Sequence, residues 1–80
     1  MFLDHYKDFN MRFCGCLQSR LLDEDTLDHI LALDVVEDSG EQVYVVAKFD
    51  YSDGGKKVDI IFKSSNYDEA KGRYTSYVEQ

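Results

Sequence analysis

Proline and tryptophan are absent from this 80-residue chain, and cysteine occurs only twice. No apolar run approaches the roughly 20 residues that a membrane-spanning helix needs. The first residues, MFLDHYKDFNMRF, carry acids where a secretory signal peptide carries bases. Two cysteines in a chain without an export signal are expected to be reduced thiols. We therefore expect a cytosolic protein, located in the host cell cytoplasm if a phage encodes it.

Basic residues are scarce, and they are missing from one third of the chain. The sequence holds 16 Asp and Glu but only nine Lys and Arg, for a formal charge of −7. Residues 21–47 contain eight of the acids and no Lys or Arg. This charge disfavours direct contact with nucleic-acid phosphates, which needs clustered bases, and with an anionic membrane surface. It favours a basic protein as partner.

Recognisable catalytic motifs are missing as well. The sequence has no nucleophile elbow, no nucleophile–base arrangement and no glycine-rich phosphate loop. The SDGG stretch at 52–55 precedes an expected strand, which is typical of a hairpin turn and not of a phosphate loop that opens a helix. A chain of 80 residues also leaves little room for a concave active site. We therefore expect a protein that is not an enzyme and holds no cofactor.

The strongest metal-binding candidates are Cys14 and Cys16, which flank a glycine. A structural zinc needs four ligands, and the chain could add only His5, His29 or carboxylates. This spacing matches no common zinc pattern. On a helix the two thiols would point about 200° apart, whereas on a strand they could share a metal. We expect them to act as small apolar side chains, with a metal or redox role as the less favoured alternative.

Apolar residues make up 44% of the chain, including five Phe and six Tyr, which is enough for one domain spanning residues 1–80 with a real core. In residues 2–17 the apolar side chains recur every three or four positions, which predicts a helix through about Cys14. Residues 11–18 also alternate as a strand would, so their structure stays open. A second helix is expected from Asp23, as its N-cap, to near Leu33.

The second half of the sequence predicts three strands and a helix. The strands are expected over residues 32–38, 42–51 and 56–63. Tight turns containing Gly40 and Gly54 join them, and the last helix should begin with Ser65 or Asn66 as its N-cap. The fold class is therefore α+β, a three-stranded antiparallel β-meander packed on one face by N-terminal helices and a C-terminal helix.

Alternation along the middle strand places Tyr44 and Val46 on the side opposite Val43 and Val45. If helices cover only one face, Tyr44 and Val46 are partly exposed and form a contact patch beside the acidic segment. Carboxylates three or four positions apart on a helix lie about 5–6 Å apart, which is similar to the phosphate spacing of a nucleic-acid strand. The candidate partner-binding residues are therefore Asp23, Glu24, Asp25, Asp28, Asp34, Glu37, Asp38, Tyr44 and Val46.

In size, negative charge and lack of catalytic motifs, the chain resembles the small anti-restriction and anti-CRISPR inhibitors that phages and mobile elements encode. This resemblance implies a non-enzymatic inhibitor that docks a negative face onto a basic, nucleic-acid-handling protein. The alternative is an assembly subunit or homodimer that pairs through the Tyr44/Val46 patch or through an edge strand. The sequence leaves open whether the protein is a monomer or a homodimer.

Overall fold

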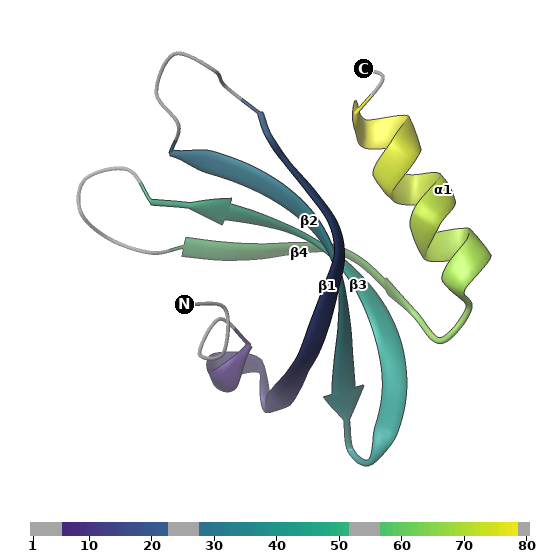
Figure 1. The fold of residues 1–80 in the computed structure, drawn as a ribbon. Coiled ribbons are helices and arrows are strands. Elements are labelled where there is room, and N and C mark those ends of the chain that lie inside the picture. The colour runs from purple at the N-terminus through teal and green to yellow at the C-terminus, as the bar shows by residue number, and fades with distance from the viewer. Residues whose placement is uncertain (1–5, 23–27, 52–56, 79–80) are drawn as a thin grey trace.

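A computed structural model describes residues 6–22, 28–51 and 57–78, and the structural statements below concern these residues. The elements, in chain order, are a short 3-10 helix η2 (Lys7–Phe9), the strands β1 (Met11–Leu21), β2 (His29–Asp38), β3 (Glu41–Asp50) and β4 (Lys57–Ser64), and the helix α1 (Tyr67–Val78). The strands form one antiparallel sheet in the order β1-β2-β3-β4 (Figure 1). The α+β class is confirmed, but the meander has four strands instead of three.

The additional strand is β1, which occupies much of the region expected to be an N-terminal helix. Its pairing with β2 slips twice, so that Cys14 and Leu17 are extra residues, each forming a β-bulge. Met11 and Phe13 follow strand alternation, but each bulge then lengthens the spacing of inward-facing side chains to three. The helical prediction was wrong here, because the apolar spacing behind it includes Leu17, an exposed bulge residue that faces no core, and the strand alternative for 11–18 was right.

The second predicted helix, from Asp23 to near Leu33, is also wrong where the structure describes it. His29 already begins β2, and residues 23–27 lie outside the described part of the chain. β2 is an inner strand of the sheet, with β1 on one side and β3 on the other. Its apolar residues are therefore buried on both faces, and a continuous apolar run of this kind cannot be told from a buried helix by its periodicity.

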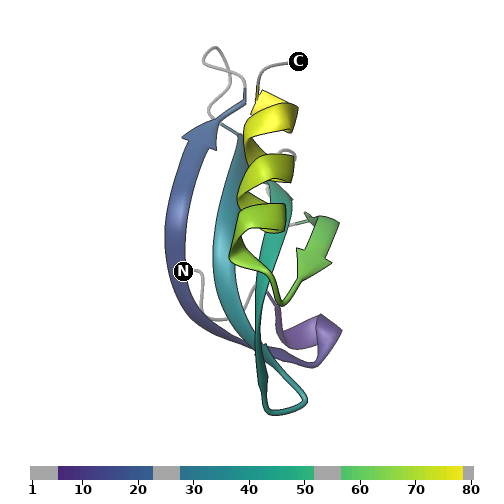
Figure 2. The same ribbon diagram turned by 90° about the vertical axis from the view of Figure 1, so that its right-hand side faces the viewer.

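The sheet is covered from both sides. α1 packs on β2, β3 and β4, whereas Tyr6 and η2 lie on the opposite side, toward which the strands curve (Figures 1 and 2). We call these two sides the helix face and the inner face. The helix-face core consists of Leu31, Leu33, Val46, Ala70 and Tyr74. The inner-face core consists of Tyr6, Met11, Ala32, Val36, Val43, Val45, Ala47 and Phe49. The expectation of helices on one face only is therefore wrong.

Two local signals in the second half of the sequence are confirmed, whereas the predicted turn at Gly54 lies outside the described residues. Ser39 and Gly40 form the β2–β3 turn with φ values of 56° and 83°, as a two-residue hairpin turn with two left-handed positions requires. The N-cap of α1 is Asn66, whose side-chain oxygen accepts a hydrogen bond from the backbone N–H of Glu69 at 3.1 Å. These short-range patterns could be predicted from the sequence because each depends on neighbouring residues alone.

Candidate functional site

Asp34 lies inside the protein. Its side chain is 0% exposed, and it shares the inner face with Ala32 and Val36. The hydroxyl of Tyr6 donates a hydrogen bond of 2.6 Å to Asp34 Oδ2, while Oδ1 has no hydrogen-bond partner among the described residues. The expectation that Asp34 belongs to an exposed acidic face is therefore wrong, because the sheet is covered on this side too.

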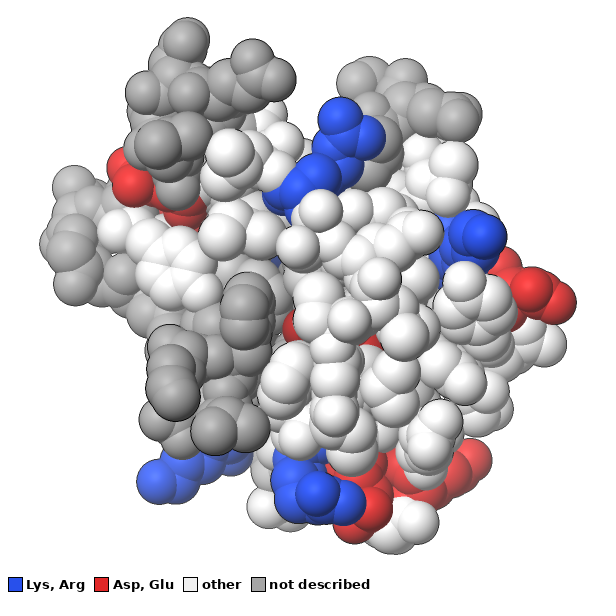
Figure 3. All heavy atoms as spheres, viewed as in Figure 1, with Lys and Arg blue, Asp and Glu red and all other residues white. Residues whose placement is uncertain are grey.

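Glu37 and Asp38 are each paired with a base from another strand. Arg12 Nη2 lies 2.8 Å from Glu37 Oε2, and Lys63 Nζ lies 2.6 Å from Asp38 Oδ2. The hydrogen bond from Lys63 lowers the pKa of Asp38 below its ordinary value. In Figure 3 the Asp and Glu side chains beside β1 likewise adjoin Lys and Arg side chains and form no continuous acidic surface on that face. The predicted negative surface free of bases is wrong at these two positions.

Asp28 lies at the opposite end of the sheet from Glu37 and Asp38. Asp28 is half-buried, and its carbonyl oxygen accepts a hydrogen bond of 2.8 Å from the backbone N–H of Tyr51. Beside it, His29 Nε2 lies 3.4 Å from Asp50 Oδ2. The predicted residues Asp23, Glu24 and Asp25 lie outside the described residues. The structure therefore separates Asp28 from Glu37 and Asp38 along the full length of β2.

Of the two residues in the predicted apolar patch, Val46 is 0% exposed, because α1 covers it together with Leu33. Its assignment to a surface patch is wrong. Tyr44 is half-buried, and its ring meets the ring of Tyr67 edge to face, with centroids 5.5 Å apart. Tyr67 is 38% exposed, and Lys71 Nζ lies 5.9 Å from the centroid of its ring. An aromatic pair therefore reaches the surface where α1 begins.

This pair continues across the helix face as a row. Gly15 on β1 pairs with Val35 on β2, and Val35 pairs with Tyr44 on β3. Directly paired residues share a face of the sheet. All three are half-buried, and a Cβ at Gly15 would meet nothing within 4 Å. We call Gly15, Val35, Tyr44 and Tyr67 the tyrosine patch. It lies on the helix face where α1 begins, and its members stay half-buried or exposed, with the Arg12–Glu37 ion pair on neighbouring positions.

Tyr67, Gly15 and Val35 were missed as surface contacts from the sequence. The sequence alone predicts that Tyr67 belongs to the buried stripe of the last helix, because its spacing fits Ala70 and Tyr74. The one available signal was its position directly after the N-cap Asn66, where a helix has only just met the sheet. Gly15 and Val35 could not be found, because their proximity to Tyr44 depends on a register that includes two bulges.

Both edges of the sheet are protected against pairing with another strand. Two bulges interrupt β1, and β4 carries the exposed charged residues Lys57, Asp59 and Lys63. Bulges and edge charges are devices by which sheets avoid edge-to-edge association. A homodimer built by strand pairing is therefore disfavoured at either edge.

A buried polar cluster surrounds Asp34. Burial raises the pKa of Asp34, although hydrogen bonding from Tyr6 and Cys16 acts in the opposite direction. Burial also raises the pKa of Tyr6, and the neighbouring Asp34 raises it further. Cys16 pairs with Asp34 across β1 and β2, and burial together with Asp34 raises the pKa of its thiol to about 11. This cluster could not be recognised in the sequence, because its members come from three separate segments.

The two thiols do not converge on one point. Cys14 Sγ lies 3.6 Å from the carbonyl oxygen of Arg12, whereas Cys16 Sγ lies 3.4 Å from that of Gln18 in the other direction along the strand. Both cysteines are free. Within residues 6–22, 28–51 and 57–78, no three His, Cys, Asp or Glu side chains are grouped so that they could hold a metal ion. The shared metal site considered for a strand therefore has no support in this geometry.

The thiols should differ in reactivity. At about pH 8 a thiol with a pKa of about 11 is almost fully protonated, and the thiolate is the reactive form. Both thiols are exposed, so the raised pKa of Cys16 is the difference between them, and we expect Cys16 to react with Ellman's reagent at least about tenfold more slowly than Cys14. Cys14→Ser should remove the fast reaction, and Cys16→Ser should preserve it. Equal rates in the two variants would contradict the placement of Cys16 beside Asp34.

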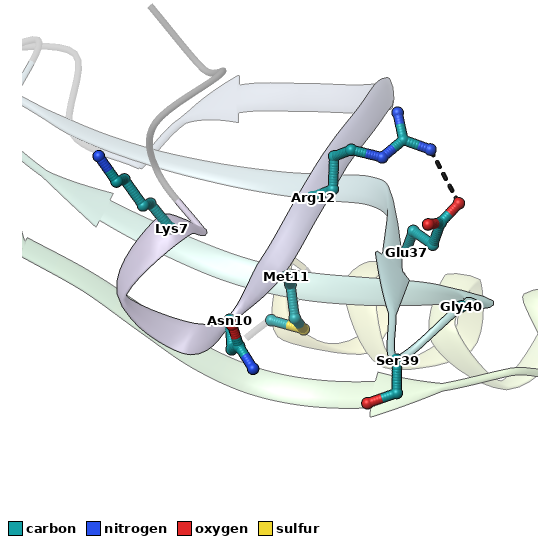
Figure 4. A pocket seen from close by; sticks show the side chains of 7 residues that line it. All are labelled: Lys7, Asn10, Met11, Arg12, Glu37, Ser39 and Gly40. Carbon is teal, nitrogen blue, oxygen red and sulfur yellow. Dashed lines mark hydrogen bonds and ion pairs between the residues drawn. The ribbon is translucent and has the colours of Figure 1, made fainter.

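A surface pocket lies where η2 leads into β1, near the β2–β3 turn (Figure 4). It is lined by Lys7, Asn10, Met11, Arg12, Glu37, Ser39 and Gly40. Figure 4 shows Arg12 turned toward Glu37 and Lys7 pointing away from both. Because the side chains of Lys7 and Arg12 do not point at a common centre, this pocket is not arranged to bind an anion.

Comparisons with protein families, with curated proteins and with solved structures found no match for this chain. Of the helices that the structure describes, none has the length and apolar character needed to cross a bilayer.

Proposed function

We propose that this chain is a small non-enzymatic binding protein that contacts a protein partner through the tyrosine patch. The observation that carries the proposal is the Tyr44–Tyr67 ring pair, in which Tyr67, the first residue of α1, is 38% exposed and Tyr44 is half-buried. Tyrosine supplies a large contact area and a polar tip at a low cost in side-chain entropy, which explains its enrichment at protein interfaces.

The partner is proposed to be basic. A formal charge of −7 attracts positively charged surfaces over distances of about a Debye length, and it repels a second copy of the same chain. At the tyrosine patch itself, Glu37 is balanced by Arg12. Negative charge would therefore speed the encounter and select the partner, while the aromatic contact would supply most of the affinity.

A finer form of the proposal is that the partner handles nucleic acid and is inhibited by this protein. Its support is the acid excess alone, because no single continuous acidic surface lies along β2. Competition between this protein and DNA or RNA for the captured partner would test this finer form separately.

Tyr67→Ala should weaken partner binding by about 30-fold, which corresponds to the roughly 2 kcal/mol typical of an interface hot spot. The measurement is capture of proteins from the native host lysate on the immobilised wild-type chain, followed by affinity measurement with the purified partner. Thr75→Ala is the matched control, because Thr75 is an exposed residue further along α1. Circular dichroism should show that both variants fold.

Undiminished binding by Tyr67→Ala would show that the tyrosine patch is not the contact surface. If charge reversal at Asp28 then abolished binding, the acidic end of the sheet would be the docking surface instead. Light scattering would test for a homodimer. If the molar mass of the wild type doubles as the concentration rises, and Tyr67→Ala stays monomeric, the chain forms a homodimer through the same patch.

A further inference from the structure

Tyr6 is the only buried residue in the described segment that precedes β1. It is 0% exposed, whereas the following residues Lys7, Asp8, Phe9 and Asn10 are all exposed. The backbone hydrogen bonds within this turn are local, from Phe9 and Met11 to the carbonyl oxygen of Tyr6 at 3.0 and 3.2 Å and from Asn10 to the carbonyl oxygen of Lys7 at 3.1 Å. One side chain therefore makes the main attachment of this segment to the inner face.

The surroundings of the Tyr6 ring have the features of a binding site. Phe13 stacks parallel to it with centroids 6.4 Å apart, and Phe49 meets it edge to face at 6.0 Å. The hydroxyl reaches Asp34 Oδ2 at 2.6 Å. A phenol ring is thus held by aromatic contacts along its body and by a charge-assisted hydrogen bond at its tip.

The carboxylate at the base of this site depends on a hydroxyl donor. The titratable groups that face it are Tyr6, Cys16 from β1, and Tyr51 after β3, and all of them are acids. No Lys, Arg or His of the described residues forms an ion pair with Asp34. The site is therefore matched to a neutral ring with a hydroxyl group, because a ring without one leaves Asp34 Oδ2 without its 2.6 Å hydrogen bond.

The junction with β1 allows the segment to move as a unit. Asn10 has a φ of 61°, in the left-handed region, directly between η2 and β1. A change in the backbone angles of Asn10 alone would redirect the segment before β1, while the strand pairing that begins at Met11 would be kept.

We propose that the inner face around Asp34, Phe13 and Phe49 is a binding site for the side chain of a tyrosine, and that Tyr6 is its removable occupant. When Tyr6 leaves, the site receives a tyrosine presented by a second protein. This site lies on the opposite side of the sheet from the tyrosine patch, and it is independent of the proposed function.

The test uses the full chain, as wild type and as Tyr6→Ala, with p-cresol as the probe because it is the tyrosine side chain itself. Toluene, which lacks the hydroxyl group, is the matched control ligand. We expect p-cresol to raise the melting temperature of Tyr6→Ala and to bind it at least about tenfold more tightly than toluene. The wild type should bind p-cresol more weakly, in proportion to the fraction of molecules in which Tyr6 is displaced.

Each outcome decides the proposal. Equal affinity of folded Tyr6→Ala for p-cresol and toluene would overturn the choice of a phenol as ligand. Binding of p-cresol to the wild type is measured through the amide chemical shifts of residues around Asp34. If these shifts show no saturable change, the proposal that Tyr6 can leave the site is overturned. If Tyr6→Ala does not fold, the measurement on the wild type tests the proposal by itself. Binding of p-cresol without binding of N-acetyltyrosine amide would show that the site excludes the tyrosine of a polypeptide.

Discussion

Val46→Asp is expected to destabilise the protein by about 4 kcal/mol or more, because it places a carboxylate in an apolar core without a partner. Val46 is 0% exposed and packs in the helix-face core with Leu33 and Ala70. Total folding free energies of small domains are only about 5–15 kcal/mol. A large fraction of Val46→Asp molecules should therefore be unfolded, as urea denaturation followed by circular dichroism would show.

Gln42→Asp is the control for this substitution. Gln42 lies on β3 with the same alternation as Val46, but it is exposed. The same charge should change stability by less than about 0.5 kcal/mol there. If the two variants are equally stable, Val46 is exposed and not buried, as the simple alternation of the sequence predicts.

Tyr6→Phe is expected to lower the free energy of unfolding by about 1.5–3 kcal/mol at neutral pH, the range for hydrogen bonds to charged groups. The substitution keeps the ring between Phe13 and Phe49 but removes the donor to Asp34, whose other oxygen already has no hydrogen-bond partner among the described residues. Tyr44→Phe is the matched control, because its hydroxyl has only a long contact, 3.5 Å from the amide of Gln42. The measurement is again urea denaturation.

The cost of Tyr6→Phe should grow with pH. The folded-state pKa of Asp34 is raised above its unfolded value of about 3.9, so the native state holds this proton more tightly and loses stability as the pH rises through the folded-state pKa. Removing the Tyr6 hydroxyl raises that pKa further, because the hydrogen bond favours the charged form. Below about pH 4 the carboxyl is neutral in both states, and Tyr6→Phe should then cost less. A cost independent of pH would mean that Asp34 is not buried beside Tyr6.

β3, β4, the turn at Gly40 and the cap of α1 could be predicted from the sequence, because alternation and turn chemistry are local. β1 could not, since bulges at Cys14 and Leu17 interrupt its alternation. β2 was predicted only in part, because burial on both faces removes the alternation that distinguishes a strand.

The candidate site was harder to predict than the fold. Tyr44 was correctly placed on the side opposite Val45, but the sequence could not show that α1 covers this side at Val46 and leaves it open at Val35. The acids of β2 were visible as a cluster, yet the bases that neutralise them come from β1 and β4. Arg12 lies opposite Glu37 through strand register, whereas Lys63 reaches Asp38 from β4, which does not pair with β2. Both positions depend on contacts between distant parts of the chain.

The most direct measurement is an NMR titration of the side-chain carboxyl carbons of Asp34 and Asp38, two acids of the same strand that the sequence presents as equals. We expect the pKa of Asp34 to lie above its ordinary value, because the carboxyl is buried, and that of Asp38 to lie below it, because Lys63 donates to it. An Asp34 that titrates at or below the ordinary aspartate pKa of about 3.9 would contradict its burial. The acids of β2 would then again be candidates for a shared negative surface, and the inner-face site around Tyr6 would lose its basis.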